Sequence, residues 1–478
     1  MTRSDAPSFF HPAVAEWFSR AFPEGPTPAQ ELGWPAISHG DDTLIAAPTG
    51  SGKTLAAFLV AIDRCLRREP DESGPKTSVV YVSPLRALTV DVAENLEAPL
   101  EKITALGDEI GAPVRPLRVA VRNGDTPQSE RQAMMRVPPD IIVTTPESLY
   151  LLATSRRGRA VLATVETVIV DEIHALARDK RGSHLALTLE RLDRIVTSSG
   201  RRRPTRIGCS ATQRPIGEIA RLLVGTGQDR AAPDGAARCE IVDVGHQRDL
   251  DISIVLPTDE LGAVMTTEQL DEIVASLAEQ IESHRTTLVF VNTRKMAERV
   301  AHLLRGIIGD DAVAAHHGSL SMERRLSVES RLREGALRAV VATASLELGI
   351  DVGPVGLVCQ LGSPRAIATF LQRVGRADHR RDGIPKGRVY PMTRDELVEC
   401  VALFCATRAG ALDAVHPPVA PLDILAQQIV AEVAVSGDDG IGEGELARLV
   451  RRAAPYADLS DDDFEAVVTL VAEGVRTG

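Results

Sequence analysis

The chain contains 478 residues, of which 44% are hydrophobic and 25% are charged, a composition typical of globular proteins rather than fibrous or disordered ones. At roughly 100–200 residues per domain, this length indicates about three domains. The net charge of −12 argues against a protein that is basic over its whole surface, but it does not exclude a local basic groove for nucleic acid.

Short apolar runs alternate with helical patterns through the first half of the chain. The run at 42–49 precedes a stretch with apolar residues at 55, 59, 62 and 66, the spacing of one helix face. Similar runs, bounded by Pro, Gly, Ser or Thr and apolar throughout, follow at 78–84, 140–146, 167–175 and 205–212. Such runs are typical of parallel strands buried on both faces. They predict a doubly wound α/β domain over residues 8–230.

A second α/β domain is predicted over residues 231–400. The segment at 225–248 is rich in Gly, Ala and Asp, and we expect a linker there. Apolar runs then resume at 286–294, 337–344, 354–362 and 388–392. Long helical segments separate the first two, as they do in a sheet built from strand–helix–strand units.

The pattern becomes helical after PPVAP at 417–421. Three apolar-periodic stretches begin at residues 422, 443 and 460, and Ser460 with Asp463 is typical of a capping box. Three short helices over residues 415–478 indicate either a helix-turn-helix type module or a helical appendage that packs on the rest of the chain.

Features of secreted and membrane proteins are missing from the sequence. The first 17 residues lack the apolar core of a signal peptide, and the longest weakly polar region, at 338–362, contains acidic residues and fits two strands. The six cysteines lack the spacing of a zinc site or a disulfide framework. We therefore expect a cytoplasmic protein without a membrane partner.

The segment APTGSGKT at 47–54 lies between a predicted strand and a predicted helix. Backbone N–H groups in such a loop, together with the helix N-terminus, form a nest for phosphates. Lys53 is expected to reach the β- and γ-phosphates of ATP. Thr54 is expected to contact ATP and also to bind Mg²⁺. The ATP-binding residues predicted here are Thr49, Gly50, Ser51, Gly52, Lys53 and Thr54, although Ala47 replaces the usual first glycine.

The acidic pair in DEIH, at 171–174, ends a predicted strand. Phosphoryl transfer needs a carboxylate for Mg²⁺ and a group that orients the attacking water. Asp171 is the candidate metal ligand, and Glu172 is the candidate base or water-positioning residue. Without the phosphate loop, such a pair would more often be a solvated strand end.

Taken together, these motifs resemble those of superfamily 2 helicases. APTGSGKT, DEIH and SAT (210–212) follow TPAQ (27–30) and precede HHGSLSMERR (316–325), in the order of that family. The resemblance covers roughly residues 12–475 and implies two RecA-like domains of the P-loop NTPase type. It also implies that Gln30 reads adenine and that Gly349 and Asp351 contact ATP from the second domain.

The same resemblance implies which residues contact nucleic acid. The segments at 83–88 and 144–149 match those that hold the strand backbone, and the segment at 288–294 matches one of the later motifs. Their placement makes Arg86, Thr145 and Arg294 candidate phosphate contacts. Each of these could also be an ordinary surface or capping residue. Ser210 and Thr212 would connect the ATP site to the nucleic-acid strand.

The segment QRVGRADHR at 372–380 matches the last helicase motif. Alone it would indicate a solvated cationic loop, but the resemblance implies that Arg376 is an arginine finger for the ATP of the first domain. His379 stands where many relatives have a second arginine. With RNGDTP (122–127) and residues 171–192, this histidine resembles the Lhr (large helicase-related) group, in which it also approaches the phosphates.

Asp378 departs from that group, where glycine is expected. It could weaken the contact with ATP, or it could pair with Arg380 or Arg381.

The sequence is thus identified as an Lhr-like ATP-dependent helicase or translocase. The resemblance implies 3′-to-5′ movement on single-stranded DNA and unwinding of duplexes that include RNA–DNA hybrids. It also implies a winged helix at 415–478, which we expect to be incomplete because no room remains for its wing strands. The alternatives are an RNA helicase of the DEAD-box kind, a binding switch without turnover, and a nuclease-coupled translocase.

Overall fold

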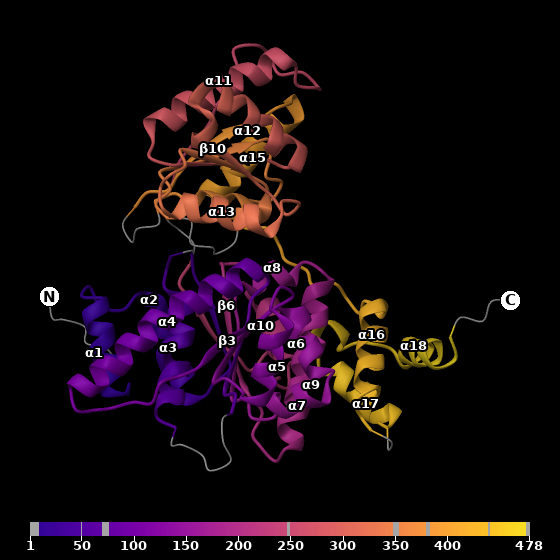
Figure 1. Cartoon of the computed structure of the whole chain (residues 1–478). Helices are drawn as coiled ribbons and strands as arrows, with labels where there is room; N and C mark the ends of the chain where they lie inside the picture. The colour runs from indigo at the N-terminus through magenta and orange to yellow at the C-terminus, as the bar shows by residue number, and fades with distance from the viewer. Residues whose placement is uncertain are drawn as a thin grey trace. The chain divides into compact units, whose positions relative to one another are not determined.

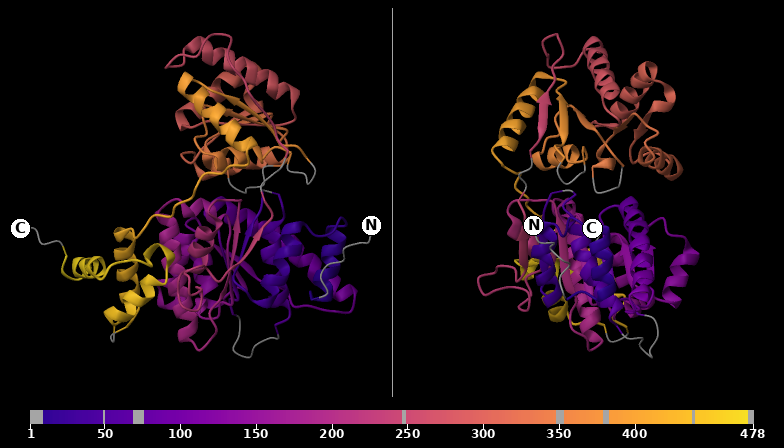
Figure 2. Two further views of the ribbon diagram at one scale, coloured as in Figure 1. Left: turned by 180° about the vertical axis from the view of Figure 1, so that it is seen from behind. Right: turned by 90° about the vertical axis from the view of Figure 1, so that its left-hand side faces the viewer.

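The computed structural model (Figures 1 and 2) describes residues 9–48, 50–68, 76–245, 249–347, 353–378, 383–437 and 440–474. The chain folds into two compact units. The first unit comprises residues 1–47, 51–244 and 414–478, and the second comprises residues 48–50 and 245–413. None of the helices in the described ranges is long and apolar enough to cross a membrane.

A sheet of seven parallel strands forms the centre of the first unit, in the order β3-β4-β2-β5-β6-β1-β7. Its central strands are buried on both faces, which is why their sequences are apolar throughout. The strands are β1 (Thr43–Ala46), β2 (Val79–Val82), β3 (Val119–Arg122), β4 (Ile141–Thr144), β5 (Thr167–Val170), β6 (Thr205–Ser210) and β7 (Glu240–Asp243).

Helices cover both faces of this sheet (Figure 1). The connections between parallel strands are right-handed crossovers. The helices between β1 and β3 therefore lie on one face of the sheet, and those between β3 and β7 lie on the other face. The first set is α3 (Lys53–Leu66) and α4 (Arg86–Glu109). The second set is α5 (Gln128–Arg136), α6 (Pro146–Ala153), α7 (Arg156–Leu162), α8 (Ile173–Ala177), α9 (Lys180–Ser198) and α10 (Ile216–Val224), while α1 (Pro12–Ala21) and α2 (Pro28–His39) precede β1.

The second unit repeats this path with six parallel strands, in the order β10-β11-β9-β12-β13-β8. Taken in chain order, its strands occupy the same sequence of positions as β1 to β6 of the first sheet, which confirms the predicted pair of doubly wound domains. The strands are β8 (Asp251–Ile254), β9 (Thr287–Phe290), β10 (Val313–His316), β11 (Ala339–Ala342), β12 (Leu357–Leu361) and β13 (Lys386–Tyr390), and the helices are α11 (Thr267–Ser283), α12 (Arg294–Ile308), α13 (Met322–Arg333), α14 (Ile367–Val374) and α15 (Arg394–Arg408).

The C-terminal part contains the three predicted helices, α16 (Leu422–Val433), α17 (Glu443–Arg451) and α18 (Asp461–Glu473). They belong to the first unit, and α16 and α17 pack on α9 (Figure 1). Their apolar residues form one continuous core with those of α9. These helices are therefore packed onto the domain that carries the phosphate loop.

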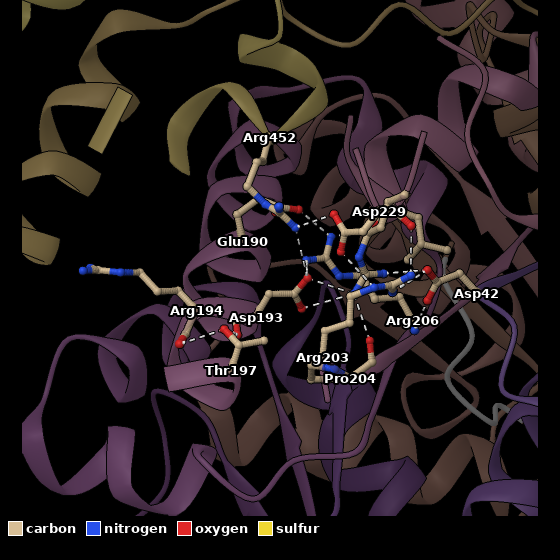
Figure 3. A network of polar contacts seen from close by, with 12 residues as sticks. Asp42, Glu190, Asp193, Arg194, Thr197, Arg203, Pro204, Arg206, Asp229 and Arg452 are labelled. Carbon is tan, nitrogen blue, oxygen red and sulfur yellow. Dashed lines mark hydrogen bonds and ion pairs between the residues drawn. The ribbon is translucent and has the colours of Figure 1, made fainter. Parts of the chain in front are cut away.

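A buried network of charged side chains also fastens α17 to the first sheet (Figure 3). Arg452, just after α17, donates through Nε to Glu190 Oε2 at 2.8 Å, and Arg206 of β6 donates to Glu190 Oε1 at 2.8 Å. Arg230 contacts Asp42 Oδ2 at 2.8 Å and Asp193 Oδ2 at 2.9 Å. These charges lie at the amino ends of β1 and β6 and are matched in pairs, as buried charges must be.

The linker predicted at 225–248 is wrong for Glu240–Asp243, which forms strand β7 and pairs with β1 along its whole length. Within this edge strand only Val242 is buried, so the sequence contains no apolar run that would reveal it. The first unit therefore continues to Val244.

Candidate active site

The phosphate loop connects β1 to α3. Gly50 and Gly52 have φ values of 79° and 77°, in the left-handed region that favours glycine. The N-cap residue of α3 is Gly52, which has no side chain to accept a hydrogen bond from the first turn. The backbone N–H groups of that turn therefore remain available to a ligand in the loop. This is the arrangement expected of an anion-binding loop.

Gln30 and Thr27, both at the start of α2, hold the loop from behind. Thr27 Oγ1 donates to Ser51 O at 2.7 Å, and Gln30 Nε2 donates to Gly52 O at 3.4 Å. A Cβ at Gly52 would lie 2.7 Å from Gln30 Nε2, so the close approach requires glycine there. The side-chain oxygen of Gln30 accepts the Thr27 N–H in a capping box, which fixes the orientation of its amide.

The predicted acidic pair lies beside the loop, at the carboxyl end of β5. Thr54 Oγ1 donates to Asp171 Oδ2 at 3.2 Å, and Lys53 Nζ lies 4.0 Å from Glu172 Oε1. Asp171, Glu172 and Lys53 are between 4% and 6% exposed. Burial and the neighbouring Glu172 raise the pKa of Asp171, although Lys53 opposes this change. The structure thus brings together four residues predicted to act on ATP.

Glu172 has a strained backbone, with a φ of 47°. Residues other than glycine rarely adopt this conformation, and such strain concentrates at functional sites. The Glu172 N–H donates to Asp171 Oδ1 at 2.8 Å, which supports the turn between β5 and α8. The main chain of Glu172 therefore holds the Asp171 carboxylate in place.

His174 joins the acidic pair to the SAT segment. The Ala211 N–H donates to His174 Nδ1 at 3.1 Å, and the same nitrogen lies 3.5 Å from Glu172 Oε2. Burial, reinforced by Lys53, lowers the pKa of His174 to about 3, so the ring is neutral at pH 7. Ser210 and Thr212 are 1% and 5% exposed, on either side of Ala211.

The residues of this loop fit a Mg²⁺–nucleotide. The Ser51 hydroxyl is buried and, within the described part of the chain, has no hydrogen-bond partner. Lys53 is buried at the start of a helix, and a hydroxyl and a carboxylate, which suit Mg²⁺, meet at Thr54 and Asp171. An anionic ligand with a divalent cation would satisfy these groups.

Two predicted nucleic-acid contacts of the first unit differ in exposure. The side chain of Arg86 is 59% exposed and donates to Asp125 Oδ1 at 2.8 Å, and a Cβ at Gly124 would lie only 2.6 Å from its Cζ. The segment at 122–127 thus positions Arg86. Thr145 is 3% exposed, and its hydroxyl caps α6 by accepting the Ser148 N–H at 3.4 Å.

In the second unit, Arg294 is exposed at the start of α12, whereas Arg376 is 2% exposed and donates to Glu347 O at 3.1 Å. Arg373, in the same motif, binds Glu347 Oε2 at 2.8 Å and lies over the Phe290 ring, so its role is to hold the motif in place. The predicted residues Thr49, Gly349, Asp351 and His379 lie outside the described residues.

Asp378 adopts a φ of 44°, the conformation for which glycine is the usual residue. Asp tolerates this conformation better than most residues. Its carboxylate lies so close to Gly383 that a Cβ there would be 2.4 Å from Asp378 Cγ. The chain therefore keeps a glycine-like backbone at this departure from the Lhr pattern, and Gly383 makes room for the added side chain.

Three family models match the chain in succession: DEAD/DEAH box helicase at residues 27–219, helicase conserved C-terminal domain at 266–381, and large helicase-related protein, winged helix domain at 405–478. "ATP-dependent helicase Lhr-Core" of Methanocaldococcus jannaschii is 41% identical over 97% of this chain and 53% of its own length. "Lhr helicase/ probable uracil glycosylase" of Mycolicibacterium smegmatis is 42% identical over 97% of this chain and 32% of its own length.

The chain belongs to the Lhr-like family of DEAD/DEAH-box helicases. The solved structure of the Mycobacterium smegmatis helicase Lhr bound to ssDNA and AMP-PNP has a TM-score of 0.87 and 43% identity, covering 97% of this chain and 58% of that one. The Lhr-like chain thus spans about a third to a half of the length of these curated relatives. The winged-helix match covers α16, α17 and α18.

One residue of this Lhr-like site was missed in the sequence. Tyr81 of β2 donates its hydroxyl to Asp171 Oδ2 and is fully buried. Its signal is faint but present: in the strand VVYV at 79–82, Tyr81 is the one residue whose side chain has a polar group.

Proposed function

We propose that this chain is a nucleic-acid-dependent ATPase that moves along single-stranded DNA. The observation that carries the proposal is the assembly of Lys53, Thr54, Asp171 and Glu172 at one end of the first sheet, with contacts of 3.2 and 4.0 Å between them. The Lhr relatives and the neighbour bound to ssDNA and AMP-PNP support it.

The residues divide the chemistry among them. Lys53 and the N-terminus of α3 bind the phosphates, and Gln30 contributes to recognition of the base. Thr54 and Asp171 would hold Mg²⁺, which when bound neutralises charge on the β- and γ-phosphates. Glu172 orients the attacking water. Gly349, Asp351 and His379 complete the nucleotide contacts in this proposal, as the family resemblance implies.

Arg376 acts as the arginine finger. Replacing it with Ala should leave ATP binding largely intact and reduce turnover by about 10³ or more, because a finger stabilises charge on the transferring phosphoryl group. Its hydrogen bond to Glu347 O keeps the guanidinium in place before nucleotide binds. Near-normal turnover of Arg376→Ala in a saturating ATP titration would contradict this role.

Arg86 and Arg294, which are exposed, contact phosphates of the strand, whereas Thr145, Ser210 and Thr212 support and connect those contacts from buried positions. Movement in the 3′-to-5′ direction and unwinding of RNA–DNA hybrids are the finer parts of the proposal. Duplexes with a 3′ or a 5′ single-stranded tail, made with a DNA or an RNA complement, test both.

The first experiment is a steady-state ATPase assay of the 478-residue chain with Mg²⁺, with and without single-stranded DNA. We expect stimulation by DNA, and a decrease of roughly 10²–10⁴ in turnover for Glu172→Gln. Absence of turnover in the wild-type chain would refute the proposal. Stronger stimulation by RNA of the same sequence would favour a helicase of the DEAD-box kind.

A further inference from the structure

Tyr81 contacts the predicted metal ligand across two neighbouring strands. In the register of β2 and β5, Tyr81 lies opposite Ile169, so Asp171 is its diagonal neighbour on the same face. A tyrosine is long enough to span that diagonal, and its hydroxyl donates to Asp171 Oδ2. The same oxygen accepts the hydroxyl of Thr54 at 3.2 Å.

The ring of Tyr81 is fixed from the other side by the helix that follows the phosphate loop. Phe58 stacks on it, with the ring centroids 4.7 Å apart and the planes at 23°. Phe58 lies four residues after Thr54, on the same side of α3. Helix α3 thus contacts Asp171 directly through the Thr54 hydroxyl, and its Phe58 ring holds Tyr81 against Asp171.

We propose that Tyr81 is a positioning residue for the Mg²⁺ site: it holds the Asp171 carboxylate in the orientation that binds Mg²⁺–ATP. The inference rests on the proposed function. Partners that orient a metal ligand typically contribute about 10- to 100-fold to metal affinity. A tyrosine that merely filled the core would contribute to stability without affecting Mg²⁺.

The test is Tyr81→Phe, which removes the hydroxyl and keeps the stacked ring. The dissociation constant of AMP-PNP is measured by calorimetry at increasing Mg²⁺ concentrations and in EDTA. We expect the Mg²⁺ concentration at half-maximal effect to rise about 10-fold, with binding in EDTA unchanged. An unchanged Mg²⁺ dependence would overturn the inference.

Two controls separate positioning from folding. Tyr456→Phe removes a hydroxyl that donates to Pro421 O at 3.0 Å from an equally buried ring in the C-terminal helices, and it should leave the Mg²⁺ dependence unchanged. In an Asp171→Asn background, Tyr81→Phe should add no further change in Mg²⁺ dependence, and an independent, additive change would contradict action through Asp171.

The wild-type chain distinguishes failure of the inference from failure of the proposed function. If Mg²⁺ does not strengthen AMP-PNP binding to the wild-type chain, the proposed function fails together with this inference. If Mg²⁺ strengthens AMP-PNP binding to the same extent in the wild-type chain and in Tyr81→Phe, only the inference about Tyr81 fails.

Discussion

The first sheet carries buried charges at both of its ends, and the two clusters differ in how the charges are matched. At the amino ends of β1 and β6, Asp42, Glu190 and Asp193 meet several arginines (Figure 3). At the carboxyl ends, Lys53 is the one lysine or arginine among the described residues within 4.0 Å of the acidic pair. A matched network holds the fold together, whereas an incompletely matched one is suited to bind a charged ligand.

The pKa values of Arg206 and Asp171 follow this difference, whereas at the matched end burial still raises the pKa of Asp193 and lowers that of Arg230. Burial by itself lowers the pKa of Arg206, but Asp193, Glu190 and Asp42 outweigh burial and raise it. At the other end burial and Glu172 raise the pKa of Asp171, because the opposing effect of Lys53 does not compensate for both. The comparison predicts that mutations at the two ends change stability in opposite directions.

The largest effect is expected at the matched end. Arg206→Met keeps much of the side-chain volume but removes a buried cation that pairs with both Glu190 and Asp193, so the free energy of unfolding should fall by about 3–5 kcal/mol. Urea unfolding followed by circular dichroism measures this. Arg203→Met is the control, because Arg203 is 30% exposed and its loss should cost about 1 kcal/mol or less. Equal losses for the two variants would break the comparison.

A change of pH tests the carboxyl end through His174. In the unfolded chain this histidine takes up a proton near pH 6.5, but in the folded chain only near pH 3. Between these values the unfolded state binds more protons, so the free energy of unfolding falls by about 1.4 kcal/mol for each pH unit below 6.5.

His174→Asn keeps an acceptor for the Ala211 N–H and removes the titration. Unfolding of both proteins between pH 6.5 and 4.5 should therefore show a shallower dependence for the variant. Identical slopes would mean that His174 is not held neutral.

The smallest effect is a gain in stability. Asp171→Asn keeps an oxygen that can accept the Glu172 N–H and places an NH2 group toward the Tyr81 hydroxyl, whose oxygen can accept from it, and it removes one of two adjacent buried negative charges. Without nucleotide, the free energy of unfolding should rise by about 1 kcal/mol. Thermal unfolding measures it, and a loss comparable to that of Arg206→Met would show that the acidic pair is structural.

The sequence predicted the carboxyl end of this sheet better than the amino end. Lys53, Thr54, Asp171 and Glu172 lie in short segments, and parallel strands bring the ends of such segments together. The partners at the amino end are far apart in sequence, and nothing local indicates that Arg206 and Arg230 are buried or that Arg452 reaches Glu190. Their positions depend on the packing of α17 and α9, which no periodicity reveals.

The prediction of strand β7 failed for a related reason. Strand β7 consists of Glu240–Asp243, with both of its ends exposed, so a single buried side chain, Val242, and pairing with β1 hold it in place. Tyr81 was overlooked because its ring suits a buried strand and only its hydroxyl has a special role. In both cases the missing information is a contact between strands, which the chain acquires only on folding.

The packing of α16 and α17 on α9 also has a consequence for synthesis. Glu190 and its partner Arg452 are 262 residues apart, and residues 245–413 of the second unit are translated between them. At about 5–20 residues per second, a ribosome needs roughly 10–50 s to make that segment. During this time the part of α9 that packs against α16 and α17 in the folded chain lacks these partners, so the first unit should need protection by chaperones until its last helices emerge.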